Sequence, residues 1–282
     1  MLVTLRQVKS MADDCNDPIV VTGIGLVTAN GFGREAAWSA VRSGVSGIRQ
    51  VTADQGLPEN LQLAAAIDLP LEFPGQLKAI RLARFAAEEA VFDANLDFSN
   101  LDLNRFGCAV SGHFGDIQYW MDERLGVAEP RRFHAEQWLP NSACWNIANR
   151  YGLNGPRFSH STACASGLVG LLTAARSIRD GQCDIALAGS AEGIEPLFAA
   201  GFSSMRVLAK GDDPLAGCLP FDERRKGFVM GEGAGMFVIE RLSHALARNA
   251  VIYAELAAGK FMADAHHVTS LDIDSAALER LI

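Results

Sequence analysis

The stretch that decides the fold is His160-Ser161-Thr162-Ala163-Cys164-Ala165-Ser166-Gly167, which continues directly into Leu168 to Ala175. Residues 156–161 predict a short buried strand that leaves a Gly-Pro turn. The apolar residues after it recur at helical spacing and predict a helix that ends at Asp180-Gly181. Cys164 is therefore expected on a strand-to-helix turn, at or near a helix N-terminus.

A helix N-terminus is a favourable position for a nucleophilic cysteine. The unpaired N–H groups and the positive end of the helix dipole favour an anion there, and the thiolate is the reactive form of cysteine. The small residues around Cys164 would let another backbone or a substrate carbonyl come close. The plainer alternative is a buried structural thiol, because free cysteines usually behave as small hydrophobic residues. Position alone favours a buried structural thiol. The case for a nucleophile therefore depends on the surrounding sequence.

Several other segments share one family pattern with this stretch. Together with Thr162-Ala163-Cys164-Ala165-Ser166-Gly167, they resemble the β-ketoacyl synthases of the thiolase superfamily, in which Thr-Ala-Cys-x-Ser-Gly carries the acyl-accepting cysteine. The resemblance runs from about residue 18 to the end of the chain. The further segments are Val20 to Thr28, Tyr151 to Pro156, Ala188 to Glu192, Pro220 to Asp222 with Gly227 to Gly235, and Asp264 to Ser270.

The resemblance implies a fold and a division of the chain. The fold class is α/β, a thiolase-like layered αβαβα fold of which this chain would form the N-terminal half, with a mixed, largely parallel sheet flanked by helices. Residues 1–17 would be a flexible N-terminal extension, 18–270 the synthase N-terminal domain, and 271–282 the start of a C-terminal domain.

The resemblance also implies a reaction, the condensing step of fatty acid or polyketide synthesis. The Cys164 thiolate would take an acyl group from acyl-carrier protein, and malonyl-carrier protein would then lose carbon dioxide and attack the acyl thioester. The Cys164 backbone N–H would contribute to the oxyanion hole. No metal or organic cofactor is implied, since the phosphopantetheine arm arrives on the carrier protein. A homodimer, or a heterodimer with a related synthase chain, is expected.

Six substrate-binding residues follow from the same resemblance. Phe202 and Phe228 match aromatic positions that line the acyl pocket and the catalytic chamber. His113 and Phe114 fall at pocket positions that are often small or aliphatic, and their bulk would restrict the length of the acyl chain. Thr269 and Ser270 would lie near the entrance for the phosphopantetheine arm.

The chain departs from the family at its end. The family completes its site with two histidines from the second half of the fold, and every histidine here precedes the point where the first is expected: residues 113, 134, 160, 244, 266 and 267. We therefore expect a fragment of a longer enzyme or one partner of a split one. Two alternatives stay open, a non-condensing partner that resembles a chain-length factor, and an acyltransferase that uses Cys164 only.

Composition limits the partners. The chain has 282 residues, 49% of them hydrophobic, and a net charge of −8. Its pI near 5.3 argues against a nucleic-acid surface. Arg131-Arg132 and Arg224-Arg225-Lys226 could attract an acidic carrier protein, although a solvated face is the simpler interpretation of both. The six cysteines show no CxxC and indicate reduced thiols. No signal peptide or membrane span is evident, so a cytoplasmic chain is expected.

The periodicity predicts strands and helices in alternation, which is typical of a layered α/β core. The strands are expected at 19–21, 61–67, 106–111, 184–188, 235–240 and 252–256. The helices are expected at 34–42, 77–95, 116–124, 142–150, 195–201 and 243–248.

Three motifs could mislead. Gly23-x-Gly25 follows a strand, but Thr28 occupies the place of the third glycine of a dinucleotide site and no acidic residue follows at the required distance. His266-His267 could suggest a metal, yet adjacent histidines on a strand point to opposite faces. His160 precedes Cys164 by four residues, and on a strand it would not reach the thiol, which favours a core or interface histidine. Glu192 and Asp222 are expected to make structural hydrogen bonds.

Overall fold

The structure is a computed structural model that describes residues 17–52, 61–69, 76–112, 117, 121, 124–126, 137, 139–267, 270 and 272–282. The predicted N-terminal extension lies outside these residues apart from Asp17, and most of the helix expected at 116–124 does too. None of the described helices is long and apolar enough to cross a membrane.

The strands are β1 (Ile19–Thr28), β2 (Gly31–Phe32), β3 (Arg49–Gln50), β4 (Leu63–Ala65), β5 (Phe106–Ser111), β6 (Arg157–Phe158), β7 (Ile185–Glu192), β8 (Met230–Gly231), β9 (Gly233–Arg241) and β10 (Ala254–Glu255). The α-helices are α2 (Arg34–Arg42), α3 (Lys78–Asp93), α5 (Ser142–Tyr151), α6 (Ser166–Arg179), α7 (Pro196–Ser204), α8 (Leu242–Ala247) and α9 (Ala276–Leu281), and the short 3₁₀ turns are η2 (Leu103–Arg105) and η4 (Ala163–Ala165).

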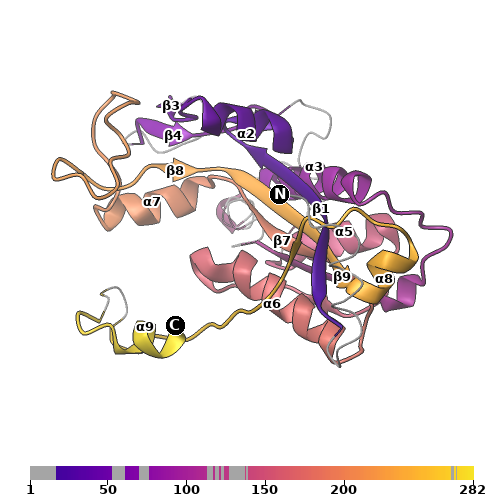
Figure 1. Cartoon of the computed structure of the whole chain (residues 1–282). Coiled ribbons are helices and arrows are strands. Elements are labelled where there is room, and N and C mark those ends of the chain that lie inside the picture. Colours follow the sequence, from indigo (N-terminus) through magenta and orange to yellow (C-terminus); the bar gives the residue numbers. More distant parts are fainter. Residues whose placement is uncertain are drawn as a thin grey trace.

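A seven-stranded sheet forms the centre of the molecule (Figure 1). Its order is β10-β1-β9-β7-β5-β6, with β2 paired to β1. The predicted mixed sheet is confirmed, but parallel pairing is less extensive than expected. It is confined to β5 with β6 and β5 with β7, because β9 runs antiparallel between β1 and β7. The connections from β5 to β6 and from β6 to β7 are crossovers, as parallel strands require. Strand β9 follows α7 after a long connection through residues 205–229.

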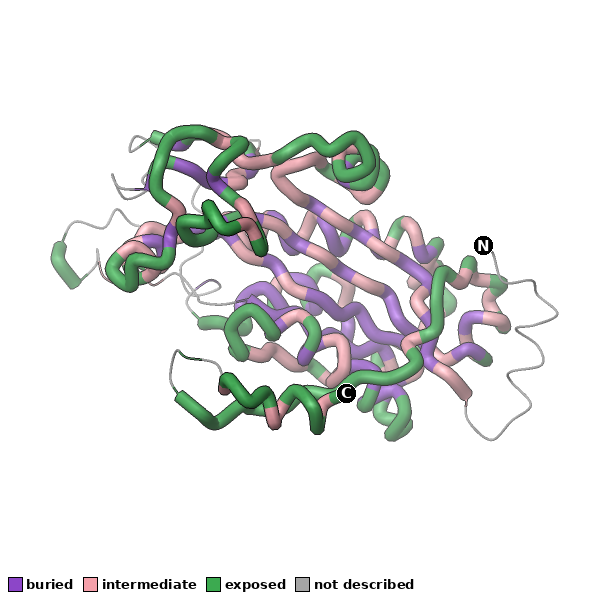
Figure 2. Tube along the Cα trace, turned by 60° about the vertical axis from the view of Figure 1, so that its left-hand side comes forward, coloured by how far each residue is buried: buried purple, intermediate pink, exposed green. Residues whose placement is uncertain are grey.

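Helices cover both faces of this sheet. One face packs on α3 and α5, and the core there includes Phe106, Cys108, Ile147, Leu187 and Met236. The other face packs on α6, whose Ala174, Ala175 and Ile178 meet alternate residues of the same strands. Figure 2 shows the strands as largely buried between these helices. The alternation of faces along each strand produces the three layers of the described chain.

Strand β1 continues through Gly23 and Gly25 to Thr28, so the bound that periodicity predicts near residue 21 is wrong. The segment Val20 to Thr28, which resembles the opening strand of the family, is one strand as that resemblance implies. A Cβ on Gly25 would lie 1.8 Å from the Ala86 carbonyl oxygen, and one on Gly23 would lie 2.3 Å from that of Ala90. The two glycines therefore let α3 pack directly on the strand. The GxG pattern serves helix packing, and it lies inside a strand where no phosphate loop can form.

A smaller sheet, in the order β3-β4-β8, stands beside α7. Its core joins Ala64, Ile194, Ala199, Leu208 and Met230. The sequence had predicted β4 but neither β3 nor β8, each of which is two residues long. This unit matters for the site because β8 and α7 form one wall of a cavity described below.

After β10 the chain is exposed for most of its length (Figure 2). Residues near Gly259 cross over α6, where a Cβ on Gly259 would lie 2.1 Å from the Leu172 side chain. The Arg176 guanidinium lies over the Phe261 ring, with its Cζ 5.4 Å from the ring centroid. Residues 276–281 form α9, and none of its residues is buried.

Candidate active site around Cys164

Cys164 lies in η4, the turn that leads without a break into α6. The predicted strand-to-helix turn is confirmed, with β6 ending at Phe158 and α6 beginning at Ser166. The strand β6 is shorter and less buried than expected, because Arg157 is exposed and Phe158 only half-buried. The thiol of Cys164 is exposed. Among the described residues, no acceptor pairs with the Cys164 backbone N–H, so this donor is free to bind a ligand oxygen.

The turn has an unusual backbone. Ala163 has φ of +49°, in the left-handed region that a residue with a Cβ adopts only at a cost. Ser166 stabilises this conformation from the first turn of α6: its hydroxyl donates to the Ala163 carbonyl oxygen at 2.7 Å and accepts from the Thr162 N–H at 2.9 Å. These two bonds fix the turn that presents Cys164.

Small residues bring α6 close to the sheet. A Cβ on Gly167 would lie 2.5 Å from the Ser190 hydroxyl of β7. One on Gly170 would lie 3.2 Å from both the Ala109 carbonyl oxygen and the Ser111 hydroxyl of β5. The glycines after Cys164 therefore set the depth at which the helix start sits on the carboxyl ends of β5 and β7.

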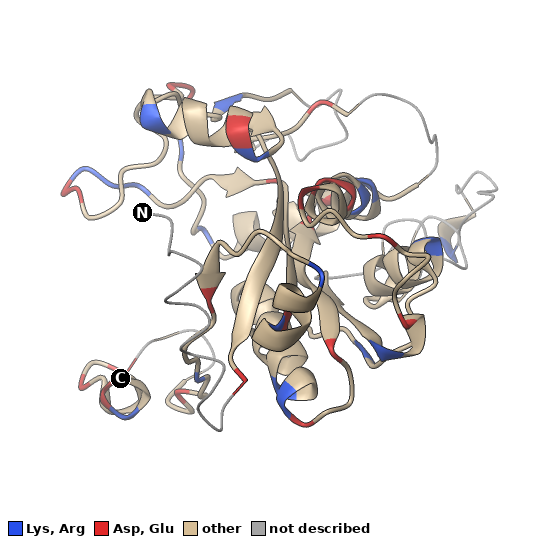
Figure 3. Cartoon of the chain, turned by 45° about the vertical axis from the view of Figure 1, so that its right-hand side comes forward, with Lys and Arg blue, Asp and Glu red and all other residues tan. Residues whose placement is uncertain are grey.

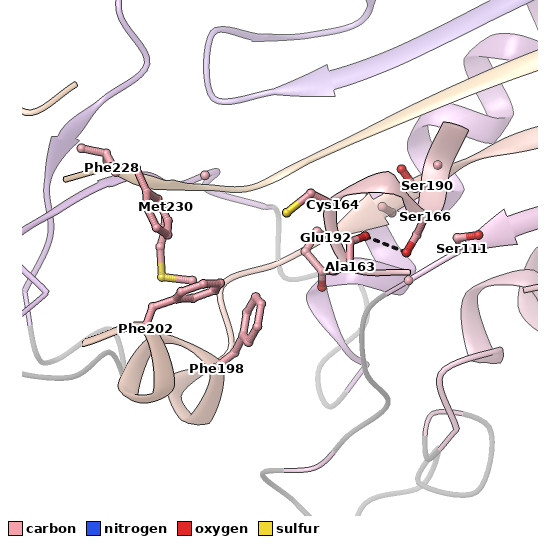
Figure 4. Close-up of a pocket in the computed structure, with 15 residues that line it drawn as sticks. Ser111, Ala163, Cys164, Ser166, Ser190, Glu192, Phe198, Phe202, Phe228 and Met230 are labelled. Atoms are coloured by element: carbon pink, nitrogen blue, oxygen red, sulfur yellow. Dashed lines mark hydrogen bonds between the residues drawn. The ribbon is translucent and has the colours of Figure 1, made fainter. Parts of the chain in front are cut away.

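A cavity of about 530 Å³ opens beside Cys164. Figure 4 shows the Cys164 side chain on one side of it, with aromatic side chains of α7 and of the segment before β8 on the other. Its described lining is largely apolar and comes from β5, η4, α6, β7, α7 and β8: Ser111, Gly112, Ala163, Cys164, Ser166, Gly167, Ser190, Ala191, Glu192, Phe198, Phe202, Phe228, Val229, Met230 and Gly231.

Three phenylalanines form a continuous aromatic wall of this cavity. The ring centroids of Phe198 and Phe202 lie 4.7 Å apart, and those of Phe202 and Phe228 lie 5.2 Å apart, both pairs edge to face. The sequence singled out Phe202 and Phe228 but missed Phe198 and Met230. Phe198 could have been found, because it precedes Phe202 by one helical turn on the predicted helix. No local sequence signal singles out Met230.

A buried carboxylate supports this wall. The side chain of Glu232 is 3% exposed, and it follows the cavity residue Gly231. One oxygen accepts the Ile194 N–H at 3.0 Å, and the other accepts the Ile67 N–H at 2.6 Å and pairs with Lys78 Nζ at 2.5 Å. Glu232 therefore ties the small sheet, the approach to α7 and the start of α3 together. Sequence reasoning assigned it no role.

The sequence predicts four further substrate-binding residues. His113, Phe114 and Thr269 lie outside the described residues. Ser270 is exposed, does not line the cavity, and donates its N–H to His267 Nδ1 at 3.1 Å.

The remaining candidates have structural surroundings. His160 stacks on Phe158 and donates its N–H to the Ser111 hydroxyl at 3.2 Å, and within the described part its buried Nε2 has no partner. Asp222 holds its own loop, and the hydrogen bond from Arg224 keeps the pKa of that carboxyl below its usual value. Glu192 lines the cavity at the end of β7.

The chemistry of the cavity follows from its lining. Within the described lining, Glu192 is the only acidic or basic side chain apart from the thiol of Cys164, and no histidine is present. No group of three or more His, Cys, Asp or Glu among the described residues could hold a metal ion. The arrangement offers a nucleophilic sulfur, a backbone N–H beside it, and an apolar chamber. It can accept an acyl group with a hydrocarbon tail.

The fold and this cavity place an exposed cysteine at a helix start, beside an apolar chamber in a layered α/β core. Comparison with known proteins identifies the family to which the chain belongs. The family described as "Beta-ketoacyl synthase, N-terminal domain" matches residues 16–245. The chain belongs to the β-ketoacyl synthase family.

Individual relatives are also described as β-ketoacyl or 3-oxoacyl synthases. The chain is 34% identical over 269 residues to 3-oxoacyl-[acyl-carrier-protein] synthase 2 of Staphylococcus aureus (strain N315), covering 90% of this chain and 65% of that protein. It is 33% identical to a putative polyketide beta-ketoacyl synthase 1 of Streptomyces halstedii, covering 94% of this chain and 68% of the relative. The chain thus spans about two thirds of the length of these relatives.

Solved structures share the fold. One is a type II PKS acyl-carrier protein in complex with its ketosynthase bound to the hexaketide, with a TM-score of 0.84 and 30% identity, covering 94% of this chain and 68% of that one. Another is a β-ketoacyl synthase from Burkholderia phymatum STM815, with a TM-score of 0.80 and 27% identity, covering 94% and 69%. The predicted thiolase-like fold is confirmed by these neighbours.

Proposed function

We propose that this chain accepts an acyl group on Cys164 as the first half-reaction of a β-ketoacyl-acyl-carrier-protein synthase of fatty acid or polyketide synthesis. The observation that carries the proposal is the exposed Cys164 thiol at the start of α6, facing an apolar cavity of about 530 Å³. An acyl chain buried there gains hydrophobic free energy of about 0.8 kcal/mol for each CH₂ group removed from water.

The transfer uses groups that the chain provides. The Cys164 thiolate attacks the carbonyl carbon of an acyl thioester, and the negative charge that develops on the carbonyl oxygen is stabilised by the free Cys164 N–H. The tetrahedral intermediate then collapses, the carbon–sulfur bond to the carrier breaks, and the carrier thiol leaves. An acyl-Cys164 thioester remains, with its tail among Phe198, Phe202 and Phe228.

The second half-reaction needs more than the described cavity contains. Loss of carbon dioxide from a malonyl thioester leaves a carbanion, which attacks the acyl-Cys164 carbonyl and forms a new carbon–carbon bond. Donors must stabilise the enolate during this step. No histidine occurs in the described lining, so these donors would come from groups outside it.

The binding roles predicted from the sequence remain part of the proposal. Phe202 and Phe228 would contact the acyl chain, which their place in the aromatic wall supports. His113 and Phe114 would limit acyl length, and Thr269 and Ser270 would contact the phosphopantetheine arm. We also propose that residues 18–270 act as the N-terminal domain of the synthase, which the family match over residues 16–245 supports.

The partner of this reaction is acyl-carrier protein. The solved neighbour that pairs an acyl-carrier protein with its ketosynthase supports this assignment. The carrier would bring the phosphopantetheine arm, so the chain would need no cofactor of its own. Figure 3 shows Lys and Arg interspersed with Asp and Glu over the helices and loops. We further propose a cytoplasmic location and a dimer with a second copy or a related chain.

Intact-mass spectrometry tests the acylation. The purified chain is incubated with hexanoyl-acyl-carrier protein and compared with the Cys164→Ala and Cys218→Ala variants. Cys218 is the matched control because its thiol is also exposed and free but lies outside the cavity lining. We expect one acyl adduct on the wild type and on Cys218→Ala, and none on Cys164→Ala. An adduct that persists in Cys164→Ala, or no adduct on a folded wild type, would contradict the proposal.

An acyltransferase that uses Cys164 only is the second candidate. The absence of histidine from the described lining favours it, because the transfer needs no enolate stabilisation. Adding malonyl-carrier protein to the acylated chain separates the two. Release of carbon dioxide with a lengthened product indicates condensation, whereas movement of an unchanged acyl group to a new acceptor indicates simple transfer.

A further inference from the structure

Two cysteines outside the Cys164 cavity face each other inside the core. Cys108 lies in β5 and Cys144 lies in the first turn of α5, and they are 1% and 3% exposed. Their Sγ atoms are 3.7 Å apart. Each sulfur also lies near the backbone carbonyl of the other residue, at 3.8 Å for Cys108 Sγ and 3.5 Å for Cys144 Sγ. The two thiols are in direct contact.

This contact is close to what a covalent bond needs. A disulfide has an S–S length of about 2.05 Å, so the sulfurs would have to approach by about 1.7 Å. A disulfide therefore requires the two side chains to rotate and the first turn of α5 to move toward β5. No sequence motif indicates this pair, because a long intervening segment separates the two residues.

The surroundings prepare one of the two thiols for reaction. The hydrogen-bonding contact between the two thiols lowers the pKa of Cys144 against the opposing effect of burial, and it raises the pKa of Cys108. Cys144 also benefits from its place in the first turn of α5, where the helix dipole favours an anion. The third buried cysteine, Cys183, is different. Burial raises its pKa to about 11, and in the described part no hydrogen bond joins it to a second thiol.

We propose that Cys108 and Cys144 are a redox modification site that forms a reversible disulfide between β5 and α5 when the chain meets hydrogen peroxide. The Cys144 thiolate attacks one peroxide oxygen, a sulfur–oxygen bond forms, the O–O bond breaks, and water leaves after taking up a proton. The Cys108 sulfur then attacks the Cys144 sulfenic acid, an S–S bond forms, the S–O bond breaks, and a second water leaves. The two sulfurs give up two electrons, and the peroxide takes them.

The peroxide can reach the pair through the start of α5. Asn141, the residue before the helix, makes no side-chain capping bond, and residues 139–141 are exposed. The first turn of an uncapped helix opens at a lower free energy than the rest of the core. Cys144 lies in that turn, so a local opening exposes its sulfur while β5 stays in place.

The disulfide would act on the wall of the Cys164 cavity. Strand β5 ends at Ser111, and Ser111 and Gly112 both line that cavity. A covalent link from β5 to the start of α5 would restrain the strand end. The site therefore gives the chain a sensor of oxidation next to, but separate from, its exposed nucleophile.

Mass spectrometry of the full chain tests the proposal without any carrier protein or substrate. The exposed thiols of the reduced, folded chain are blocked with N-ethylmaleimide, the reagent is removed, and the chain is treated with hydrogen peroxide. It is then denatured, alkylated with iodoacetamide and digested without reductant. We expect a linked pair of peptides that carry Cys108 and Cys144, lighter by two hydrogen atoms than the separate peptides and released by dithiothreitol, while Cys183 is alkylated in full.

Variants sharpen the result. Cys108→Ser and Cys144→Ser should each abolish the linked peptides, whereas Cys183→Ser should keep them. The proposal is overturned if both thiols remain fully alkylatable at a peroxide dose that oxidises the exposed thiols of an unblocked sample. It is also overturned if the link forms only in guanidinium, or if either cysteine links to Cys183 instead. Comparison of folded and denatured wild type keeps the test decisive if a variant fails to fold.

Discussion

The starts of α5 and α6 place a cysteine at similar backbone positions with opposite outcomes. Cys144 lies in the first turn of α5 and Cys164 in the turn that leads into α6, and neither helix has a side-chain cap. Cys144 is 3% exposed and packs against β5, whereas the Cys164 thiol is exposed beside an apolar cavity. Both cysteines lie at a helix start, so the packing around that start decides whether the sulfur can meet a substrate.

The largest expected difference is in reaction with a small alkylating reagent. We expect iodoacetamide to modify Cys164 on the order of a thousand-fold faster than Cys144 in the folded chain, because a buried thiol reacts only after a local opening that costs about 4 kcal/mol. Timed quenching followed by peptide mass spectrometry measures both rates in one sample. Rates within a factor of ten would contradict the contrast, and denatured chain gives the unprotected reference.

The two helices should also differ in what their side chains contribute to stability. Ile147 of α5 is fully buried, while Leu168 of α6 is 70% exposed. Ile147→Ala should lower the free energy of unfolding by about 2–5 kcal/mol, because it leaves a cavity in the core. Leu168→Ala should change it by less than about 0.5 kcal/mol. Urea denaturation measures both, and equal losses would show that the start of α6 is covered in solution.

The smallest predicted effect concerns the turn that presents Cys164. Ser166→Ala removes the hydrogen bonds to Ala163 and Thr162 and should cost about 1–2 kcal/mol of stability. Ser177→Ala is the matched control, because its hydroxyl also bonds a carbonyl, that of Thr173, from the same helix. We expect Ser166→Ala to slow alkylation of Cys164 and Ser177→Ala to leave it unchanged.

A second substitution tests the cause of this effect. Ala163→Gly removes the cost of a positive φ, which is about 1–2 kcal/mol for a residue with a Cβ. In that background Ser166→Ala should slow the alkylation of Cys164 less than it does in the wild type. Equal slowing in both backgrounds would mean that Ser166 does not act through the backbone of Ala163.

Much of the large sheet and its helices could be predicted from the sequence. Buried strands such as 106–111 and helices such as 34–42 have a clear period, and their predicted bounds match β5 and α2. Strand β1 was predicted too short because Gly23 and Gly25 resemble a turn, and only the packing of α3 explains why they lie inside a strand. The strands β3 and β8 are too short to show any period.

The candidate site, too, could be predicted only in part from the sequence. Cys164 and its turn follow from local sequence, and so does the aromatic character of Phe202 and Phe228 once a family resemblance is recognised. The cavity does not follow, since Met230 and Phe198 reach it from different elements. The positive φ of Ala163 and the contact between Cys108 and Cys144 depend on tertiary packing. A sequence pattern reports the period of one element, not the distance between two.

The position of β9 has a consequence for how the chain is made. Val20 of β1 pairs with Glu240 of β9. Two neighbouring strands in the middle of the sheet therefore come from segments about 220 residues apart in the sequence. At a synthesis rate of 5–20 residues per second, β1 waits roughly 10–40 s on the ribosome before β9 emerges. During that interval the β9 edge of β1 has no partner strand, and β2 pairs with only the end of the opposite edge, although α3 can already cover one face. Nascent chains are therefore expected to depend on chaperones until residue 241 has been made.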